Sequence, residues 1–252
     1  MMTKKNIIVT GYPKSGTTWA SRLIAELAAC PLQGDWGFEH IEALYEEGKY
    51  RDSPYDCYKT HYTYDTIFSK SPKEVYKIIH IIRDPRDVVI SGSHYFTFTN
   101  LLQKGMKKIG LSLDSASFFS VSQKKKKEKM IQAVLHGDSK VNHWLSLSWK
   151  EHTEAFKDKE VLTITYEDLL TNPQEECAKI AAYLQLDIDI SYIDQCIQKQ
   201  SFEKKKKEMP HTKDVHFKKL LRQGKQGYWK EEFTSKEKSI FKEYLQTNTF
   251  YS

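Results

Sequence analysis

The chain alternates short apolar runs with longer stretches in which apolar residues recur at helical spacing. The short runs predict buried strands, at residues 7–10, 56–60, 78–82 and 161–165. The stretches between them predict helices. Strands that alternate with helices favour a mostly parallel sheet with helices on both faces. We therefore predict an α/β fold, built as a single domain over residues 1–252, with a central sheet flanked by helices.

Three segments have a less regular pattern. Residues 30–56 contain scattered Pro and Gly residues and predict loops with one short helix. Residues 97–130 combine Gly and Ser residues with the lysine run Lys124–Lys127, which predicts a flexible loop or a lid. Residues 139–157 repeat apolar and aromatic residues at helical spacing and predict a helix.

Composition narrows the class of protein. The 252 residues are 39% hydrophobic, which is enough for a sizeable core. The net charge of +6 favours anionic partners but does not separate nucleic acid from a small anionic cofactor. The four cysteines show no CxxC pairing, and no apolar run approaches the ~18 residues of a membrane span. The first predicted strand begins at residue 7, so we expect no signal peptide, a cytoplasmic location and no membrane partner.

One segment, residues 7–27, has the pattern of a phosphate-binding strand, loop and helix. Its strand ends at Gly11 and its helix is predicted from Thr17 onward. Unpaired N–H groups and the helix dipole favour an anion at a helix start, and a glycine lets the anion approach the backbone. The candidate ligands of such an anion are Lys14, Ser15, Gly16, Thr17 and Thr18.

This loop departs from the Walker A motif of nucleotide triphosphatases. Gly11 and Gly16 have the separation of GxxxxGK[ST], but Thr17 stands at the lysine position and Lys14 lies inside the loop. A generic strand–helix turn is one alternative. A P-loop kinase for small molecules is another, and it would require magnesium, for which Asp84 offers a carboxylate.

Residues at the ends of the predicted strands carry the candidate chemistry. Lys14 follows the first strand, His61 the second, Arg83 the third and Tyr166 the fourth. Ligands of α/β proteins bind outside the carboxyl ends of parallel strands. We therefore expect these four side chains to lie in one crevice.

The segment YPKSGTTW, residues 12–19, closely resembles the 5′-phosphosulfate loop of the cytosolic-type sulfotransferases, which use 3′-phosphoadenosine 5′-phosphosulfate (PAPS). The resemblance covers residues 7 to about 234. It implies a P-loop-like PAPS-binding core in which Trp19 and the loop residues bind the cofactor. It also implies transfer of a sulfuryl group to a hydroxyl or amine of a small-molecule acceptor, with PAP as product and no metal.

The segment around Lys59, Thr60 and His61 resembles the Lys-Thr-His element of that family. The resemblance implies that His61 is the general base, that Lys59 helps to place the sulfuryl group, and that Lys14 neutralises charge on the bridging oxygen. The family continues with Leu-Pro, but Tyr62-Thr63 follows here, so the adjoining pocket wall is expected to differ. Some relatives use a carboxylate base, for which the candidates are Glu39 and Glu42.

Other motifs are similar to cofactor elements of the same family. The stretch IIRDPRDVVISGSHYF resembles the 3′-phosphate element, which assigns Arg83 and Ser91 to that phosphate. The Tyr-Glu-Asp element implies that Tyr166 contacts the cofactor. Ser201 and Phe202 match the segment that packs on adenine, although Gln200 departs from its usual threonine.

A glycine-rich segment near the end resembles the signature that closes over the 3′-phosphate. It assigns Arg222, Gln223 and Gly224 to the cofactor. Gln223 replaces a lysine, which removes one positive charge, and Lys225 stands close by in sequence. We expect somewhat weaker cofactor binding than a full match would give.

The dimer element of the family, Lys-x-x-x-Thr-Val-x-x-x-Glu, is only partly present. Lys230 and Thr234 fit it, whereas Ser235 and Ser239 replace the valine and the glutamate. The oligomeric state is therefore left open.

A basic nucleic-acid-binding module is the non-enzymatic alternative. It would use the lysine runs Lys124–Lys127 and Lys204–Lys207. Because it leaves the strand-end residues unexplained, we expect a small-molecule partner and no nucleic acid. A steep salt dependence of oligonucleotide binding would favour the alternative.

Overall fold

A computed structural model describes the greater part of the chain, namely residues 4–37, 48–71, 74–96, 98, 121–208 and 224–246. It divides into two compact units. The first comprises Met1–Asp84 and Glu151–Gly227, and the second comprises Pro85–Lys150 and Tyr228–Ser252. The extent of one domain over residues 1–252 stays a prediction.

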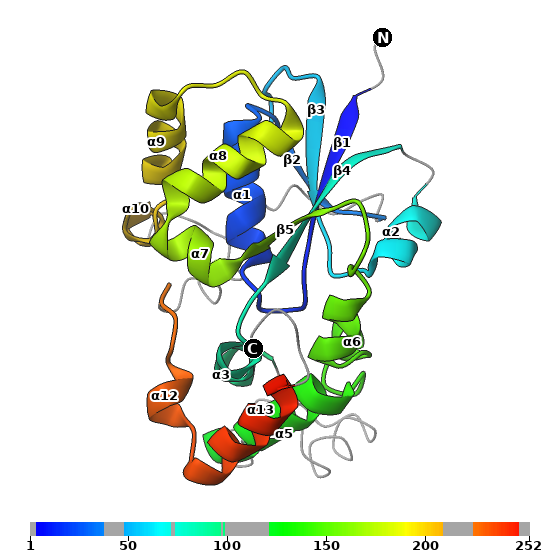
Figure 1. Cartoon of the computed structure of the whole chain (residues 1–252), viewed down its shortest axis with the longest axis vertical. Helices are drawn as coiled ribbons and strands as arrows, with labels where there is room; N and C mark the ends of the chain where they lie inside the picture. Colours follow the sequence, from blue (N-terminus) through cyan, green and yellow to red (C-terminus); the bar gives the residue numbers. More distant parts are fainter. Residues whose placement is uncertain are drawn as a thin grey trace, which may run out of the picture. The chain divides into compact units, whose positions relative to one another are not determined.

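The first unit contains a five-stranded sheet in the order β2-β3-β1-β4-β5, with every neighbouring pair parallel (Figure 1). The strands are β1 (Lys5–Thr10), β2 (Leu32–Asp35), β3 (Tyr55–Lys59), β4 (Val75–Ile82) and β5 (Leu162–Thr165). In the central strand Val9 lies between Lys59 of β3 and Ile79 of β4. The prediction of a central parallel sheet in an α/β fold is confirmed.

Different helices cover the two faces of this sheet (Figure 1). The helices of the unit are α1 (Thr17–Leu27), α2 (Tyr64–Lys70), α7 (Tyr166–Thr171), α8 (Pro173–Leu184), α9 (Ile190–Lys199) and α10 (Phe202–Glu208). Ile7 and Val9 join the core formed with α1, α8 and α9, whereas Ile8 joins the core that contains Ile67 of α2. Because successive side chains of a strand point to opposite faces, one apolar run serves two cores.

The second unit is helical in its described part. Its helices are α3 (Pro85–Tyr95), α5 (Gln123–His136), the 3₁₀ turn η2 (His143–Leu145), α12 (Trp229–Glu232) and α13 (Ser235–Gln246), while α6 (Trp149–Glu154) begins in this unit and ends in the first. The Arg86 guanidinium lies 3.7 Å from the ring centroid of Trp229, which ties α12 to α3. Lys127 of α5 pairs with Glu237 of α13 at 2.9 Å.

Three sequence predictions need correction. The loop predicted over residues 97–130 is wrong for its last part, because α5 begins at Gln123 and the Oγ of Ser122 accepts the N–H of Lys125 at its start. The helix over residues 139–157 is interrupted, since the side chain of Asn142 accepts the N–H of Trp144 and starts a separate turn. Strand β2 was missed because its sequence, LQGD, has no apolar run. Residues 99–120 lie outside the described part.

No helix in the described part of the chain is long enough and apolar enough to cross a membrane.

A buried carboxylate holds the end of α1 to its surroundings. The side chain of Glu26 is only 8% exposed. It accepts hydrogen bonds from Arg51 at 2.5 Å, from Lys199 at 3.0 Å and from the amide of Gln200 at 3.2 Å. These contacts join α1 to the segment before β3 and to the end of α9. Removing the carboxylate would leave two cations without their partner.

We predict that Glu26→Ala lowers the free energy of unfolding by about 2–3 kcal/mol, because it uncouples a buried ionic cluster. Urea unfolding followed by circular dichroism measures this change. Glu160→Ala is the matched control, since the carboxylate of Glu160 is 86% exposed and lies 3.5 Å from Lys77. Equal shifts of the two midpoints would contradict a structural role for the Glu26 cluster.

Candidate active site

The loop between β1 and α1 has the geometry of an anion site. Lys14 and Gly16 adopt left-handed backbone conformations, with φ of 75° and 86°. The N–H of Ser15 donates to the carbonyl of Tyr12 at 3.0 Å, which closes a tight turn. The hydroxyl of Ser15 is fully buried and has no hydrogen-bond partner within the described residues. A buried hydroxyl in a loop that ends at a helix start fits a bound phosphate or sulfate group.

Tyr166 packs directly on this loop. A Cβ atom on Gly16 would lie 2.5 Å from Cδ2 of Tyr166, so the ring requires a glycine there. The ring of Tyr166 also meets Trp19 edge-on, with 5.7 Å between centroids. The structure thus brings together three residues that the sequence assigned to the cofactor.

Arg83 joins the same cluster from the end of β4. Its guanidinium lies 4.3 Å from the ring centroid of Tyr166. One terminal nitrogen donates to the carbonyl of Lys14 and the other to the carbonyl of Lys225, both at 3.2 Å. Arg83 therefore links the anion loop to the C-terminal glycine-rich segment.

The segment assigned to adenine lies beside this cluster. Trp19 donates its indole N–H to the carbonyl of Gln200 at 2.9 Å. Phe202 packs against Gly224, where a Cβ atom would overlap the ring and where φ is 59°. The departure at Gln200 has a structural reason, because its amide donates to the buried carboxylate of Glu26.

His61 lies just beyond the end of β3, beside the same loop. Its Nδ1 is 2.7 Å from the carbonyl oxygen of Gly11. Because a carbonyl only accepts, Nδ1 carries the hydrogen and the lone pair of the neutral ring is on Nε2. The pKa of His61 is lowered well below its usual value, first by removal from water and then by the positive charge of Lys59. The ring is therefore neutral at neutral pH, as a general base requires.

Lys59 forms an ion pair that the sequence did not reveal. Its ammonium lies 3.1 Å from a carboxylate oxygen of Asp35 on the neighbouring strand β2. Asp35 and Lys59 are register partners at the carboxyl ends of their strands. Asp35 was missed because it belongs to the strand that sequence patterning did not predict.

Five predicted residues are not described within the first unit. Ser91 lies on α3, in the second unit. Four others lie outside the described residues, namely Glu39, Glu42, Arg222 and Gln223. The described residues contain no group of three or more His, Cys, Asp or Glu side chains arranged to hold a metal ion.

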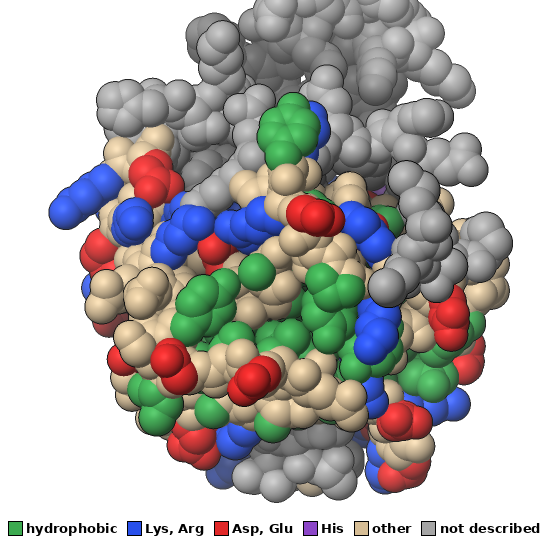
Figure 2. Space-filling view, turned by 90° about the horizontal axis from the view of Figure 1, so that it is seen from above, with side chains coloured by type: hydrophobic (Ala, Val, Ile, Leu, Met, Phe, Trp, Pro, Cys, Tyr) green, Lys and Arg blue, Asp and Glu red, His purple; other side chains and the backbone are tan. Residues whose placement is uncertain are grey.

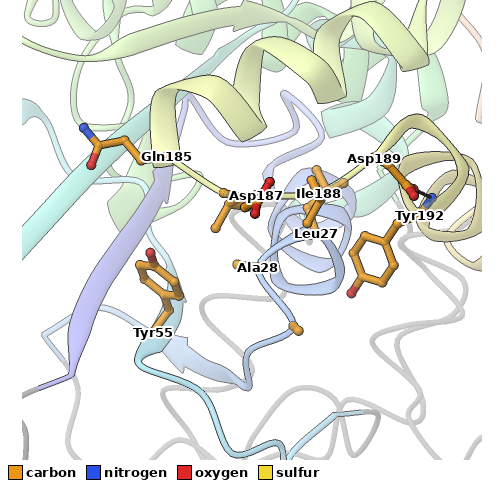
Figure 3. Close-up of a pocket in the computed structure, with 10 residues that line it drawn as sticks. Leu27, Ala28, Tyr55, Gln185, Asp187, Ile188, Asp189 and Tyr192 are labelled. Carbon is orange, nitrogen blue, oxygen red and sulfur yellow. Dashed lines mark hydrogen bonds between the residues drawn. The ribbon is translucent and has the colours of Figure 1, made fainter.

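A large groove lies at the opposite end of the sheet (Figure 3). It encloses about 580 Å³ and is formed by the end of α1, the start of β3 and the turn between α8 and α9. Leu27, Tyr55, Ile188 and Tyr192 line it. Figure 2 looks onto this end and shows exposed apolar side chains beside acidic and basic ones. Because the groove adjoins the amino ends of the strands, it is separate from the Lys14 and His61 site.

Comparisons with known proteins agree with this arrangement. The family profile described as the sulfotransferase domain matches residues 33–250. Sulfotransferase 1A1 of Rattus norvegicus is 24% identical over 255 residues, which cover 91% of this chain and 79% of the relative. Sulfotransferase 1C2 of Homo sapiens is 22% identical over 265 residues, which cover 94% and 81%.

Two solved structures share the fold. Mouse sulfotransferase SULT7A1, complexed with PAP, superposes with a TM-score of 0.67 at 24% identity, covering 98% of this chain and 85% of that chain. Retinol dehydratase, in complex with androsterone and the inactive cofactor PAP, superposes with a TM-score of 0.63 at 18% identity, covering 99% and 82%.

The chain belongs to the sulfotransferase family, because the domain profile covers most of its length. It is an enzyme of that class, and the family resemblance inferred from the YPKSGTTW loop is confirmed.

We predict that Gly16→Ala lowers the free energy of unfolding by about 1–3 kcal/mol, because it combines a left-handed φ with a clash against Tyr166. Urea unfolding measures the change. Ser15→Ala is the matched control, since it removes a buried hydroxyl without a described partner and should leave stability unchanged or higher. An equal loss in both variants would show that the strain at Gly16 is not the cause.

Proposed function

We propose that this enzyme transfers a sulfuryl group from PAPS to a hydroxyl or amine of a small-molecule acceptor. The observation that carries the proposal is the cluster of Lys14, Ser15, Arg83 and Tyr166 at the carboxyl ends of the strands. It places a buried hydroxyl and the Arg83 guanidinium beside the loop that carries Lys14, which suits a phosphosulfate group. The PAP complexes of two proteins with the same fold also support it.

The donor would be held by the loop and by the residues around it. Lys14, Ser15, Gly16, Thr17 and Thr18 would bind the 5′-phosphosulfate. Trp19, Tyr166, Ser201, Phe202 and Gly224 would surround the nucleoside, and Arg83 would approach the 3′-phosphate. By family resemblance Ser91, Arg222 and Gln223 would complete that phosphate site.

His61 would act as the general base in an in-line transfer. Its Nε2 takes the acceptor proton as the acceptor oxygen or nitrogen bonds to sulfur and the bond from sulfur to the 5′-phosphate oxygen breaks. Lys14 neutralises the charge that develops on this leaving oxygen, and Lys59, oriented by Asp35, contacts the sulfuryl oxygens. PAPS supplies the sulfuryl group and leaves as PAP, and no metal is needed for these roles.

The acceptor is proposed to be a small molecule. Retinol dehydratase, which shares the fold, has been solved with androsterone and with retinol. These two complexes support a small-molecule acceptor for this chain. A cytoplasmic location is part of the proposal and is supported by four buried cysteines that are all free thiols.

The nucleic-acid alternative is weakened by the placement of its lysines. Lys127 is engaged by Glu237 at 2.9 Å, and Lys205 is buried and pairs with Glu208 at 3.0 Å. One lysine of each run therefore forms an ion pair with a carboxylate of its own unit. Such runs fit amphipathic helices that partly face solvent.

We predict that the purified protein binds PAP without magnesium and does not bind ATP or ADP under the same conditions, because Thr17 stands at the Walker lysine position and the proposed site holds a 3′-phosphate and a 5′-phosphate. Isothermal titration measures the three affinities. Binding of ATP alone, or only with magnesium, would replace this proposal with the kinase reading.

We predict that His61→Ala lowers kcat by about 10²- to 10⁴-fold while leaving PAP affinity unchanged, since the base acts only on the acceptor. Turnover is measured with labelled PAPS and a panel of small alcohols, phenols and amines. His143→Ala is the control, because His143 is exposed. Near-normal turnover of His61→Ala would exclude His61 as the base.

The wild-type enzyme should also show a characteristic pH dependence. Because the pKa of His61 is lowered, activity should hold as pH falls to ~6.5 and be lost only below it.

A further inference from the structure

The segment that carries His61 is anchored at its main chain as well as at its ring. The carbonyl oxygen of His61 lies 3.1 Å from Nε2 of His152, a residue of α6 that is 2% exposed. Because the carbonyl only accepts, Nε2 of His152 must carry the hydrogen. This contact comes from a helix some ninety positions further along the chain. The donor of this hydrogen bond therefore lies outside β1 and β3, the strands that lead into the site.

The other anchors of the segment come from β1 and from the segment itself. The N–H of Thr60 donates to the carbonyl of Val9 at 2.9 Å, and the hydroxyl of Thr10 donates to the carbonyl of Tyr62 at 2.8 Å. Neither of these two hydrogen bonds uses the His61 carbonyl, which accepts from His152. Rotation of that peptide would swing the imidazole, whose Nδ1 donates to the Gly11 carbonyl.

The surroundings of His152 argue against a role in packing alone. Its ring is enclosed by Tyr12, Phe156 and His80, with centroids 5.7, 5.6 and 6.0 Å away. Its Nδ1 is buried and has no hydrogen-bond partner in the described structure. An apolar ring would fill this space without a buried unsatisfied nitrogen, which costs about 1–3 kcal/mol. The imidazole is therefore explained by the hydrogen bond from its Nε2 to the His61 carbonyl.

The protonation states of His152 and His80 also suit a positioning role. Burial lowers the pKa of His152 to about 4, so the ring is neutral at neutral pH. His80 is likewise buried, and its pKa is lowered well below the usual value, mainly by loss of water. Neither ring adds a positive charge next to His61 at the moment when that residue takes up a proton.

We propose that His152 is a positioning residue for the base: its hydrogen bond to the His61 main chain holds the imidazole where Nε2 meets the acceptor. This inference rests on the proposed role of His61. A misplacement of about 1 Å at a reacting group can reduce a rate by about 10²-fold. Loss of the anchor should therefore lower kcat and leave the donor site, which His61 does not form, unchanged.

A pair of amide variants tests the hydrogen bond. In His152→Gln the side-chain nitrogen is as many bonds from Cβ as Nε2 of histidine, whereas in His152→Asn it is one bond closer. Both variants lose the ring, so the loss of packing is common to them. We expect kcat of the Gln variant to stay within about 3-fold of wild type and kcat of the Asn variant to fall about 10- to 100-fold. The KM for PAPS and the affinity for PAP should be alike in both.

Amide hydrogen exchange gives a readout that needs no acceptor. In the protein alone, exchange over residues 60–63 should be several-fold faster in His152→Asn than in His152→Gln, because only the former leaves the peptide unanchored. Equal exchange and equal turnover in the two variants would overturn the proposal, whatever their thermal stability.

A double variant separates this proposal from the one on which it rests. If His152 acts through His61, His152→Asn should cause no further loss of kcat in a His61→Ala background. A further loss of the same size as in the wild-type background would show that His152 acts independently and would refute the positioning role. Normal turnover of His61→Ala alone would instead refute the base assignment.

Discussion

The absence of a side chain at Gly11 is the constraint on which the site depends. A Cβ atom there would overlap the carbonyl oxygen of Ile81, so only glycine lets the end of β1 pass this close to β4. The same residue offers its carbonyl to Nδ1 of His61. One close backbone approach therefore sets the path of the anion loop and the tautomer of the proposed base. Gly11 therefore connects the anion loop with the segment that carries the proposed base.

Electrostatics then divide the site into two parts. On the proposed donor side, Arg83 donates to the carbonyls of Lys14 and Lys225 and lies over the ring of Tyr166, so its charge is beside the anion loop. On the acceptor side, the charge of Lys59 is balanced by Asp35. Lys59 still lowers the pKa of His61, because its positive charge disfavours the protonated ring, although loss of water has the larger effect. Positive charge thus lies beside the anion loop on one side and helps to keep the proposed base neutral on the other.

Residues that follow an apolar strand could be predicted from the sequence, and residues that meet only through the fold could not. Lys14 and Arg83 follow apolar runs, so the parallel sheet brings them together as expected. Asp35 ends a strand of four residues with no apolar alternation, and only its pairing with β3 reveals it. His152 belongs to a predicted helix, yet nothing in its spacing indicates a contact with His61. Hydrogen bonds from distant residues to the main chain do not affect the periodicity of apolar residues, so the sequence pattern does not reveal them.

The departure at Gln200 shows how the donor site is tied to the core. The carbonyl of Gln200 accepts the indole N–H of Trp19, while its side chain donates to Glu26 at the other end of α1. The smaller threonine of the family motif could not reach that carboxylate. One substitution therefore couples the segment beside the proposed adenine site to the ionic cluster that holds α1. Substitutions of Glu26 and of Trp19 are therefore not expected to have additive effects, because both residues belong to one hydrogen-bond network.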